Sequence, residues 1–398
     1  MSTTSPPGPL RAQRPPETTD ATTPRPRRPR AALVGAGMIA AVHRRAALLA
    51  GAEITGVLAS TPQRARATAE EWGVAHAYQD FEQVLADDRV DVVHICTPNA
   101  THAPFAEAAL RAGKHVVCEK PLGVSAAEAE RLATLARSTD LVATVPFVYR
   151  YHPLVREIRA RRQAGEFGRW NLLHGSYLQD WMLPPEASGW RVDPALGGPS
   201  RAFADIGSHW CDLVEWVSGE RFSEVFAATS VAVPERPTGT AVSFSGPADE
   251  PGRCAPVQTE DSATVLLRTA EGLLGSTTVS QVAAGRKNRL WFELDGSEGS
   301  AVFDQENPEA VWLGGTDGNR VLVRDPGHGS PEQRRLSHLP AGHAQGYAQC
   351  FEAFVADTYA AIAGAAPDGL PTFADGLRSA RLVDAVLRSS HDRTWTKV

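Results

Sequence analysis

The sequence of 398 residues contains few cysteines, no long apolar run and no large excess of either charge. Its five cysteines are widely spaced and include no Cys-x-x-Cys pair, which argues against a disulfide framework or a zinc knuckle and favours reduced thiols in a cytoplasmic protein. No stretch approaches the roughly 18 consecutive apolar residues that span a bilayer, so no membrane association is expected. With 40 Lys and Arg against 46 Asp and Glu, the net charge of −6 offers no field for a phosphate backbone, and nucleic-acid binding is not expected.

Length and composition are those of an ordinary globular protein. At roughly 150 residues per domain, the chain has room for two or three domains with buried cores. Residues 1–30 differ from the rest because they are rich in Pro, Thr and Arg, and we expect a disordered tail there. A twin-arginine export signal is the alternative. The apolar run 31–42 that would complete such a signal is better explained as the first strand and turn of a domain.

Residues 31–149 alternate between short apolar strands and amphipathic helices. The helices carry start signals, such as Thr61 followed by Pro62 and the capping box that begins at Ser125. This alternation predicts an α/β Rossmann domain built on a parallel, doubly wound sheet. The strands are expected at 31–34, 54–59, 90–96, 116–118 and 141–145.

The first turn from strand to helix contains the pattern Gly35-x-Gly37-x-x-Ala40. Gly35 allows a tight turn, Gly37 lets the backbone approach a pyrophosphate, and Ala40 permits close packing of the helix on the strand. We therefore predict a dinucleotide site here that includes Met38 and Ile39.

The preference between NAD and NADP is left open by the second strand. An NAD-preferring fold usually places Asp or Glu at the end of this strand to bind the ribose 2′-hydroxyl. Here Ser60, Thr61 and Arg64 follow instead, and no carboxylate would repel a 2′-phosphate. These three residues are candidate cofactor contacts, although Arg64 is equally explained as a solvated helix residue.

Residues 150–398 have a different pattern, which predicts a substrate-binding and oligomerisation domain of the α+β class. Apolar and polar residues alternate along Leu290–Asp295, as in an antiparallel strand exposed on one face. We expect a large, open-faced and mostly antiparallel sheet with helices on one side, a loop at 233–258, and helices at 154–162, 345–363 and 375–389. Strands are expected at 170–177, 222–231, 263–268, 274–282, 290–295 and 311–313.

Two groups of residues suggest chemistry. Glu119-Lys120-Pro121 follows a parallel strand, at the edge where open α/β sheets bind ligands, and a lysine beside an oxidised nicotinamide can relay a proton. Alone, it is better explained as an exposed lysine before a helix. In the second group, a helix would place Asp205, His209 and Asp212 on one face, where a histidine near a carboxylate can accept a hydroxyl proton. A buried core histidine is an equal alternative.

Taken together, these motifs resemble the glucose-fructose oxidoreductase/inositol dehydrogenase (Gfo/Idh/MocA) family, over about residues 31–390. Tyr177–Trp181 and Trp190-Arg191 are most similar to the branch that contains levoglucosan, inositol and glycoside dehydrogenases. The resemblance rests on the order and spacing of Gly35-x-Gly37-x-x-Ala40, Cys96-Thr97-Pro98-Asn99 with His102, Glu119-Lys120-Pro121, and Gly197-Gly198 followed by Asp205-x-Gly207-x-His209-x-x-Asp212.

The resemblance implies an NAD(P)-dependent enzyme that oxidises a secondary hydroxyl of a sugar, anhydrosugar, glycoside or inositol, and that forms a dimer or tetramer through the open sheet. It implies Lys120, Asp205 and His209 as the catalytic set. Further implied cofactor contacts are Thr97, Pro98, Asn99, His102, Glu119, Lys120 and Arg191. Implied substrate contacts are Tyr149, Gln179, Asp180, Trp181, Arg191, Asp205, His209, His343 and Tyr347.

Two other classes of function are weighed against this one. A non-catalytic, nucleotide-sensing regulator could use the same fold, but it would have no chemical need for both Lys120 and His209. A metal site could be assembled from His94, Cys96, His102, His115 and Cys118, but no metal-ligand spacing repeats and buried strand cysteines are usually small hydrophobes. No metal site is expected.

Overall fold

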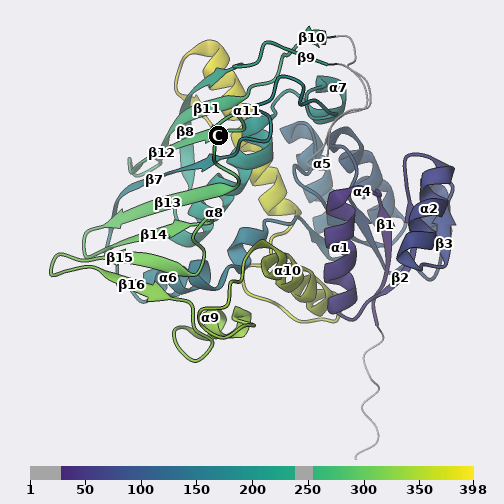
Figure 1. Ribbon diagram of the computed structural model, residues 1–398, viewed down its shortest axis with the longest axis horizontal. Helices are drawn as coiled ribbons and strands as arrows, with labels where there is room; N and C mark the ends of the chain where they lie inside the picture. Colours follow the sequence, from purple (N-terminus) through teal and green to yellow (C-terminus); the bar gives the residue numbers. More distant parts are fainter. Residues whose placement is uncertain (1–27, 238–253) are drawn as a thin grey trace, which may run out of the picture.

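The computed structural model describes residues 28–237 and 254–398 (Figure 1). The tail expected at 1–30 therefore lies outside the described residues apart from its last three, as does the middle of the loop expected at 233–258. At the start of the described chain, Arg30 donates hydrogen bonds from its backbone and its guanidinium to Asp91, so the first strand begins one residue earlier than expected.

The N-terminal domain is a parallel six-stranded sheet covered by helices on both faces. Its strand order, β3-β2-β1-β4-β5-β6, reverses direction next to β1, and this confirms the predicted Rossmann fold. The strands are β1 (Arg30–Val34), β2 (Glu53–Leu58), β3 (His76–Tyr78), β4 (Val92–Ile95), β5 (His115–Cys118) and β6 (Ala143–Thr144). The helices are α1 (Met38–Leu49), α2 (Pro62–Trp72), α3 (Phe81–Ala86), α4 (His102–Arg111) and α5 (Ala126–Arg137), with a 3-10 turn η1 (Asn99–Thr101) before α4.

The predicted helix starts at Thr61 and Ser125 are found in the structure, and Asp80 begins a further helix in the same way. Thr61, Asp80 and Ser125 each accept a hydrogen bond from a backbone N–H of the first turn, at the N-termini of α2, α3 and α5. Gly73 ends α2 in the left-handed conformation, with φ of +64°.

The second sheet has nine strands in the order β16-β15-β14-β13-β7-β12-β11-β8-β17, and neighbours are antiparallel except for the parallel pair β7 and β12. This confirms the predicted second fold class. The strands are β7 (Trp170–Leu178), β8 (Phe222–Ser230), β11 (Ser262–Thr269), β12 (Leu274–Ser280), β13 (Arg289–Gly296), β14 (Ser300–Asp304), β15 (Ala310–Gly314), β16 (Arg320–Val323) and β17 (Thr396–Lys397). A separate two-stranded ribbon pairs β9 (Glu235–Pro237) with β10 (Cys254–Pro256).

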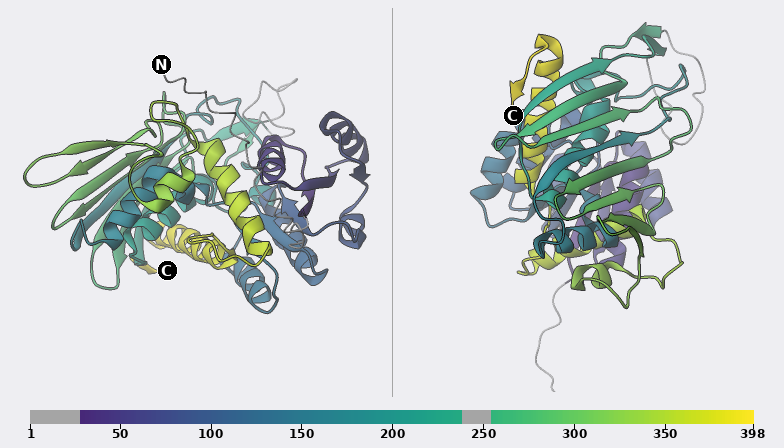
Figure 2. Two further views of the ribbon diagram at one scale, coloured as in Figure 1. Left: turned by 90° about the horizontal axis from the view of Figure 1, so that it is seen from below. Right: turned by 90° about the vertical axis from the view of Figure 1, so that its left-hand side faces the viewer.

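One face of the nine-stranded sheet packs on helices and the other is bare, as the right-hand view of Figure 2 shows. Along β13, Leu290, Phe292 and Leu294 are fully buried, and the intervening residues face outward. The outer face exposes Leu172, Leu266 and Leu274 on the central strands and Val321 and Val323 on β16. It also carries a half-exposed polar cluster in which Nε2 of His174 lies 3.4 Å from Asp295 and 3.8 Å from Glu293.

The covering helices of this domain also join it to the Rossmann domain. Helix α10 packs on α1, and α11 packs on α5 and on β8, with Phe373 and Leu377 buried in the Rossmann core (Figure 1). The helices are α6 (Pro153–Gln163), α7 (Pro194–Gly197), α8 (Ser208–Ser218), α9 (Pro331–Leu336), α10 (Tyr347–Ile362) and α11 (Phe373–Asp392), with the turns η2 (Val148–Tyr151) and η3 (Phe203–Gly207).

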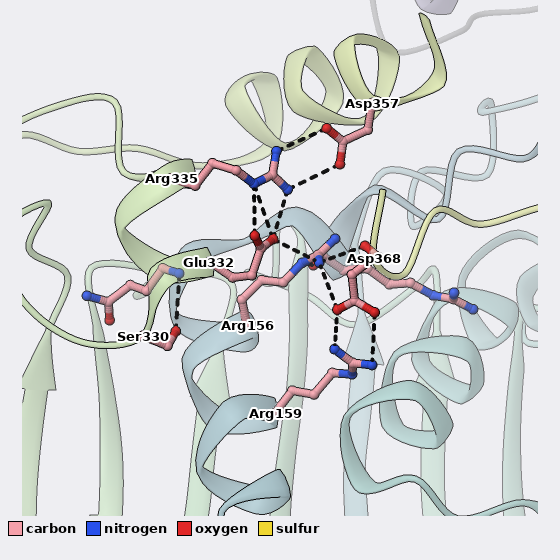
Figure 3. Close-up of polar contacts among 9 residues, drawn as sticks. Arg156, Arg159, Ser330, Glu332, Arg335, Asp357 and Asp368 are labelled. Carbon is pink, nitrogen blue, oxygen red and sulfur yellow. Dashed lines mark hydrogen bonds and ion pairs between the residues drawn. The ribbon is translucent and has the colours of Figure 1, made fainter. Parts of the chain in front are cut away.

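A network of charges fixes α6, α9 and α10 to one another (Figure 3). The guanidinium of Arg156 is almost fully buried and lies near Glu332, while Arg159 pairs with Asp368. Arg335 bridges Glu332 on its own helix and Asp357 on α10. Because α10 also packs on α1 of the Rossmann domain, these ion pairs fix the position of a helix that lies where the two domains meet.

The sequence leads us to expect neither a membrane-spanning helix nor a disulfide bond. Within residues 28–237 and 254–398, no helix is long and apolar enough to cross a membrane. The five cysteines, all in the described part of the chain, are free; Cys254 is exposed and the others are buried.

Candidate active site

The turn after β1 has the geometry that a dinucleotide requires. Gly35 has a φ of +118°, and a Cβ there would lie 2.4 Å from the carbonyl oxygen of Cys96. Beside Gly37 a Cβ would meet nothing within 4 Å, and no side chain caps α1. Ala40 is fully buried against the sheet. The open space and the uncapped helix N-terminus fit a diphosphate, since the first N–H groups of a helix are unpaired and carry partial positive charge.

The end of β2 holds the three residues predicted to decide between NAD and NADP. Thr61 caps α2, and the guanidinium of Arg64 reaches back to the carbonyl oxygen of Ala36 in the dinucleotide turn, at 3.2 Å. Ser60 is exposed beside them. Arg64 is exposed to solvent, and its guanidinium lies next to the turn where a dinucleotide would bind.

The segment after β4 is tied to both neighbouring motifs. The amide of Asn99 donates to the carbonyl oxygen of Gly197, at 2.8 Å, and the ring of His102 lies between the carbonyl oxygens of Pro121 and Thr97. The hydroxyl of Thr97 accepts a hydrogen bond from Thr101. The segment therefore shapes the edge of the sheet at which Lys120 emerges.

Lys120 and Asp205 form an ion pair between the two domains. The Nζ of Lys120 lies 2.5 Å from Oδ1 of Asp205 and 3.0 Å from its backbone oxygen, and both side chains are largely buried. The other carboxylate oxygen accepts a hydrogen bond from Gln281 and lies 3.7 Å from Arg191. Burial raises the pKa of Asp205, but Lys120 and Arg191 outweigh it and hold that pKa well below its usual range.

His209 lies next to this ion pair and is surrounded by aromatic rings. Its ring packs edge-on against Phe147 and Tyr149, and Tyr177 lies beside it. Its Nδ1 atom is buried and has no hydrogen-bond partner among the described residues. Burial, followed by the charge of Lys120, lowers the pKa of His209 to about 3. The imidazole is therefore neutral at physiological pH.

The predicted grouping of Asp212 with His209 is wrong. Asp212 instead pairs with Arg150, which also binds Asp375 on α11. Asp205 lies in the π-helical turn η3, whereas Asp212 lies on the regular helix α8 that follows it. The carboxylate of Asp212 pairs with the positive charge of Arg150. The carboxylate near His209 is therefore Asp205.

A second polar network lines the same region and joins the predicted contacts Tyr149, Gln179 and Trp181 through Asn288, which the sequence analysis missed. The hydroxyls of Tyr149 and Tyr177 lie 2.7 Å apart, and both bond to the amide of Asn288. The amide of Gln179 donates to the same oxygen of Asn288 and accepts from the indole of Trp181. Gln281 and Asn288 flank strand ends, and a sequence without the strand pairing gives no signal that they meet Asp205 and the tyrosines.

The remaining predicted substrate contacts fall into two groups. Arg191 stacks between Trp190 and Trp181, near Asp205, and the ring of Tyr347 lies 6.1 Å from that of Tyr149. Arg191 and Tyr347 therefore lie in the site. Asp180 instead pairs with exposed Lys287 at 2.6 Å. His343 falls into the second group with Asp180: it lies in an exposed segment before α10, where its Nδ1 lies 3.4 Å from the carbonyl oxygen of Ala341.

The residues weighed as metal ligands have other partners. His94 contacts His43 and Tyr359, and Nδ1 of His115 accepts a hydrogen bond from the backbone of Val142. His102 lies between two backbone carbonyls. These three histidines therefore hydrogen-bond to protein groups.

The low pKa of His209 predicts a loss of stability in acid. An unfolded histidine binds a proton near pH 6.5, whereas folded His209 does so near pH 3, so the unfolded state binds more protons between these values. Stability therefore falls as the pH falls through this window, by about 2 kcal/mol from this residue at about pH 5. Urea unfolding of the wild type and of His209→Gln at about pH 7.5 and pH 5 measures it; an equal pH dependence in both would contradict the assignment.

Comparisons with known proteins agree with the geometry. Residues 29–147 match the model of an oxidoreductase family with an NAD-binding Rossmann fold, GFO/IDH/MocA, and residues 155–302 match the C-terminal domain of the same family. A levoglucosan dehydrogenase of Pseudarthrobacter phenanthrenivorans is 33% identical, over 85% of this chain and 88% of its own. An inositol 2-dehydrogenase of Rhizobium meliloti is 29% identical, over 90% of this chain and 95% of its own. A solved levoglucosan dehydrogenase complex with NADH and levoglucosan superposes with a TM-score of 0.84 at 30% identity, covering 94% of this chain and 99% of its own.

Proposed function

We propose that this chain, which belongs to the GFO/IDH/MocA oxidoreductase family, catalyses the nicotinamide-dependent oxidation of a sugar-like substrate in the following way. The protein is an oxidoreductase of the sugar, anhydrosugar and inositol dehydrogenase type. The observation that carries the assignment of the reacting groups is the Lys120 and Asp205 ion pair beside neutral His209. All three lie where the carboxyl end of β5 meets the second sheet.

His209 is the proposed general base. A secondary hydroxyl placed in its pocket would give up its proton to the imidazole as the carbon loses hydride. Lys120 donates a hydrogen bond to the same oxygen, which stabilises the negative charge that develops there. Asp205 keeps the ammonium of Lys120 in position, and Gln281 holds Asp205 from its other side.

The dinucleotide supplies the hydride acceptor when it is bound. The turn at Gly35 and Gly37 and the N-terminus of α1 would hold its diphosphate, and Thr97, Asn99 and Glu119 would line the segment nearest to Lys120. The substrate ring would lie among Tyr149, Gln179, Trp181, Arg191 and Tyr347, where aromatic faces and a few polar groups suit a polyol.

The test is a panel of substrates assayed through the absorbance of reduced nicotinamide. Aldoses, anhydrosugars including levoglucosan, inositols and glycosides would each be offered with NAD⁺ and NADP⁺. We expect turnover on one type of ring. Dinucleotide binding without turnover on any of them would refute this substrate class and favour a nucleotide-sensing role.

The residues after β2 predict that NADP⁺ is accepted. Arg64 is held at the dinucleotide turn, Ser60 and Thr61 offer hydroxyls, and no carboxylate lies in the sequence between them. We expect Arg64→Ala to raise the Kd of NADP⁺ roughly tenfold, as the loss of a charged hydrogen bond would, with little change for NAD⁺. Equal effects on both dinucleotides, measured by titration calorimetry, would refute a role for Arg64 at the 2′-phosphate.

We also propose a cytoplasmic homo-oligomer, a dimer or tetramer, that forms through the open face of the nine-stranded sheet. The exposed leucines of β7, β11 and β12 support this, because monomers seldom expose a large apolar patch. Leu266→Glu, on the exposed face of β11, is expected to shift the mass measured by light scattering toward the monomer. An unchanged mass would exclude this face as the interface.

A further inference from the structure

A chain of hydrogen bonds runs from Glu119 into the interior of the Rossmann domain. Nε2 of His43 lies 3.0 Å from Oε1 of Glu119, and Nδ1 of His43 lies 2.9 Å from Nδ1 of His94. At the far end, Nε2 of His94 lies 2.8 Å from the hydroxyl of Tyr359. Both histidines are fully buried, and Tyr359 and Glu119 are only 4% and 7% exposed. We call these four residues the buried relay.

The chemistry of Glu119 fixes the direction of its hydrogen bond with His43. Glu119 is ionised: burial raises its pKa, but the hydrogen bond from His43 and the charge of Lys120 outweigh burial and lower it. An ionised carboxylate only accepts, so His43 must donate through Nε2. Burial, reinforced by His43, keeps the pKa of His94 well below its usual value, so His94 is neutral.

The relay connects two elements that the proposed function requires, α1 and the end of β5. His43 is on α1, the helix that begins at the dinucleotide turn, and Glu119 directly follows β5 and precedes Lys120. Oε2 of Glu119 accepts the backbone N–H of Lys120, at 3.1 Å. The orientation of the Glu119 carboxylate therefore depends on its contact with α1. In turn, this orientation affects the end of β5, where Lys120 lies.

The negative charge of Glu119 acts on several of the groups around it. Its charge influences groups on several elements, namely Cys96 just after β4, Cys118 on β5, His102 on α4, Lys120, His209 on α8 and Tyr347 on α10. A carboxylate that turned away or lost its partner would disturb all of them, because an unpaired buried charge is costly.

We propose that His43, His94 and Tyr359 are positioning residues, whose hydrogen bonds hold the Glu119 carboxylate in the orientation that the dinucleotide site needs. This inference rests on the proposed function, because Glu119 is assigned there to the dinucleotide site. The three residues are too deeply buried to touch a substrate or a dinucleotide, so they act through Glu119 alone.

The chain offers matched variants for the test. His43→Leu removes the donor to Glu119, whereas His43→Gln keeps an amide donor at about the same reach. Tyr359→Phe removes the last hydroxyl of the relay. Tyr151→Phe is its control, because the hydroxyl of Tyr151 is equally buried, lies beside α10 and has no hydrogen-bond partner among the described residues.

We expect the Kd of NAD⁺, measured by titration calorimetry, to rise roughly tenfold in His43→Leu, since it loses a hydrogen bond to a charged group. His43→Gln should restore most of the affinity, Tyr359→Phe should lose about threefold, and Tyr151→Phe should equal the wild type. In assays, the KM for the dinucleotide should change more than kcat. Equal Kd values in all variants, or no rescue by His43→Gln, would overturn the proposal.

NMR of nitrogen-labelled histidine in the protein without dinucleotide gives a readout that is independent of activity. His43 should carry a proton on Nε2, and Tyr359→Phe should shift the signals of His94. A His43 without a proton on Nε2 would overturn the relay even if the enzyme is active. Conversely, a wild type that binds neither dinucleotide would refute the proposed function, while the NMR result would still decide whether the relay exists.

Discussion

Lys120→Ala should reduce kcat roughly 10²- to 10⁴-fold, the usual loss when a group that assists proton transfer is removed. The expected cause is the loss of the ammonium that Asp205 holds at 2.5 Å and that faces the substrate oxygen. The variant should bind the dinucleotide almost as tightly as the wild type, because the turn at Gly35 and Gly37 is untouched. Steady-state kinetics and calorimetry together measure both quantities.

The control is Lys120→Met, which keeps the length and packing of the side chain without its charge. It should lose as much activity as the alanine variant, since the account attributes the effect to the ammonium. Recovery of most activity in Lys120→Met would contradict this and assign Lys120 a packing role. Activity near the wild-type value in both variants would refute the lysine assignment.

His209→Gln should cause a loss of similar size, because the amide cannot act as a base. The pKa of His209 near 3 adds a prediction about pH: this base stays neutral down to about pH 5, so kcat of the wild type should not fall between about pH 7 and 5 through titration of His209. A falling limb near pH 6.5 that disappears in His209→Gln would contradict the low pKa. Near-normal turnover in the variant would remove His209 from the mechanism.

The Rossmann domain was predictable because its signals are local. A buried parallel strand, a glycine turn and a capped helix follow one another within a few dozen residues, and Gly35 and Ser125 behave as their sequence contexts indicate. The second sheet was predicted as a class, but β14, β16 and β17 were missed. They are short strands at or near the sheet edges, and their pairing is decided by partners distant in the sequence.

The site was predictable only in part, for the same reason. Lys120, Asp205 and His209 lie in spaced motifs, and the structure brings them together. Helical spacing alone gave Asp212 the wrong partner, because it could not register the π-helical turn or the charge of Arg150. Gln281 and Asn288 carry no motif at all, and they reach the site through the pairing of β12 and β13 with β7.

The most direct test of the account follows the hydride itself. The best substrate of the panel would be deuterated at the carbon that bears the reacting hydroxyl, and the reduced dinucleotide analysed by mass spectrometry after a single turnover. The account predicts that the deuterium is recovered on the nicotinamide, that none exchanges with water, and that Lys120→Ala slows this transfer. Deuterium released to solvent, or a dinucleotide that stays unlabelled while the substrate is consumed, would contradict it.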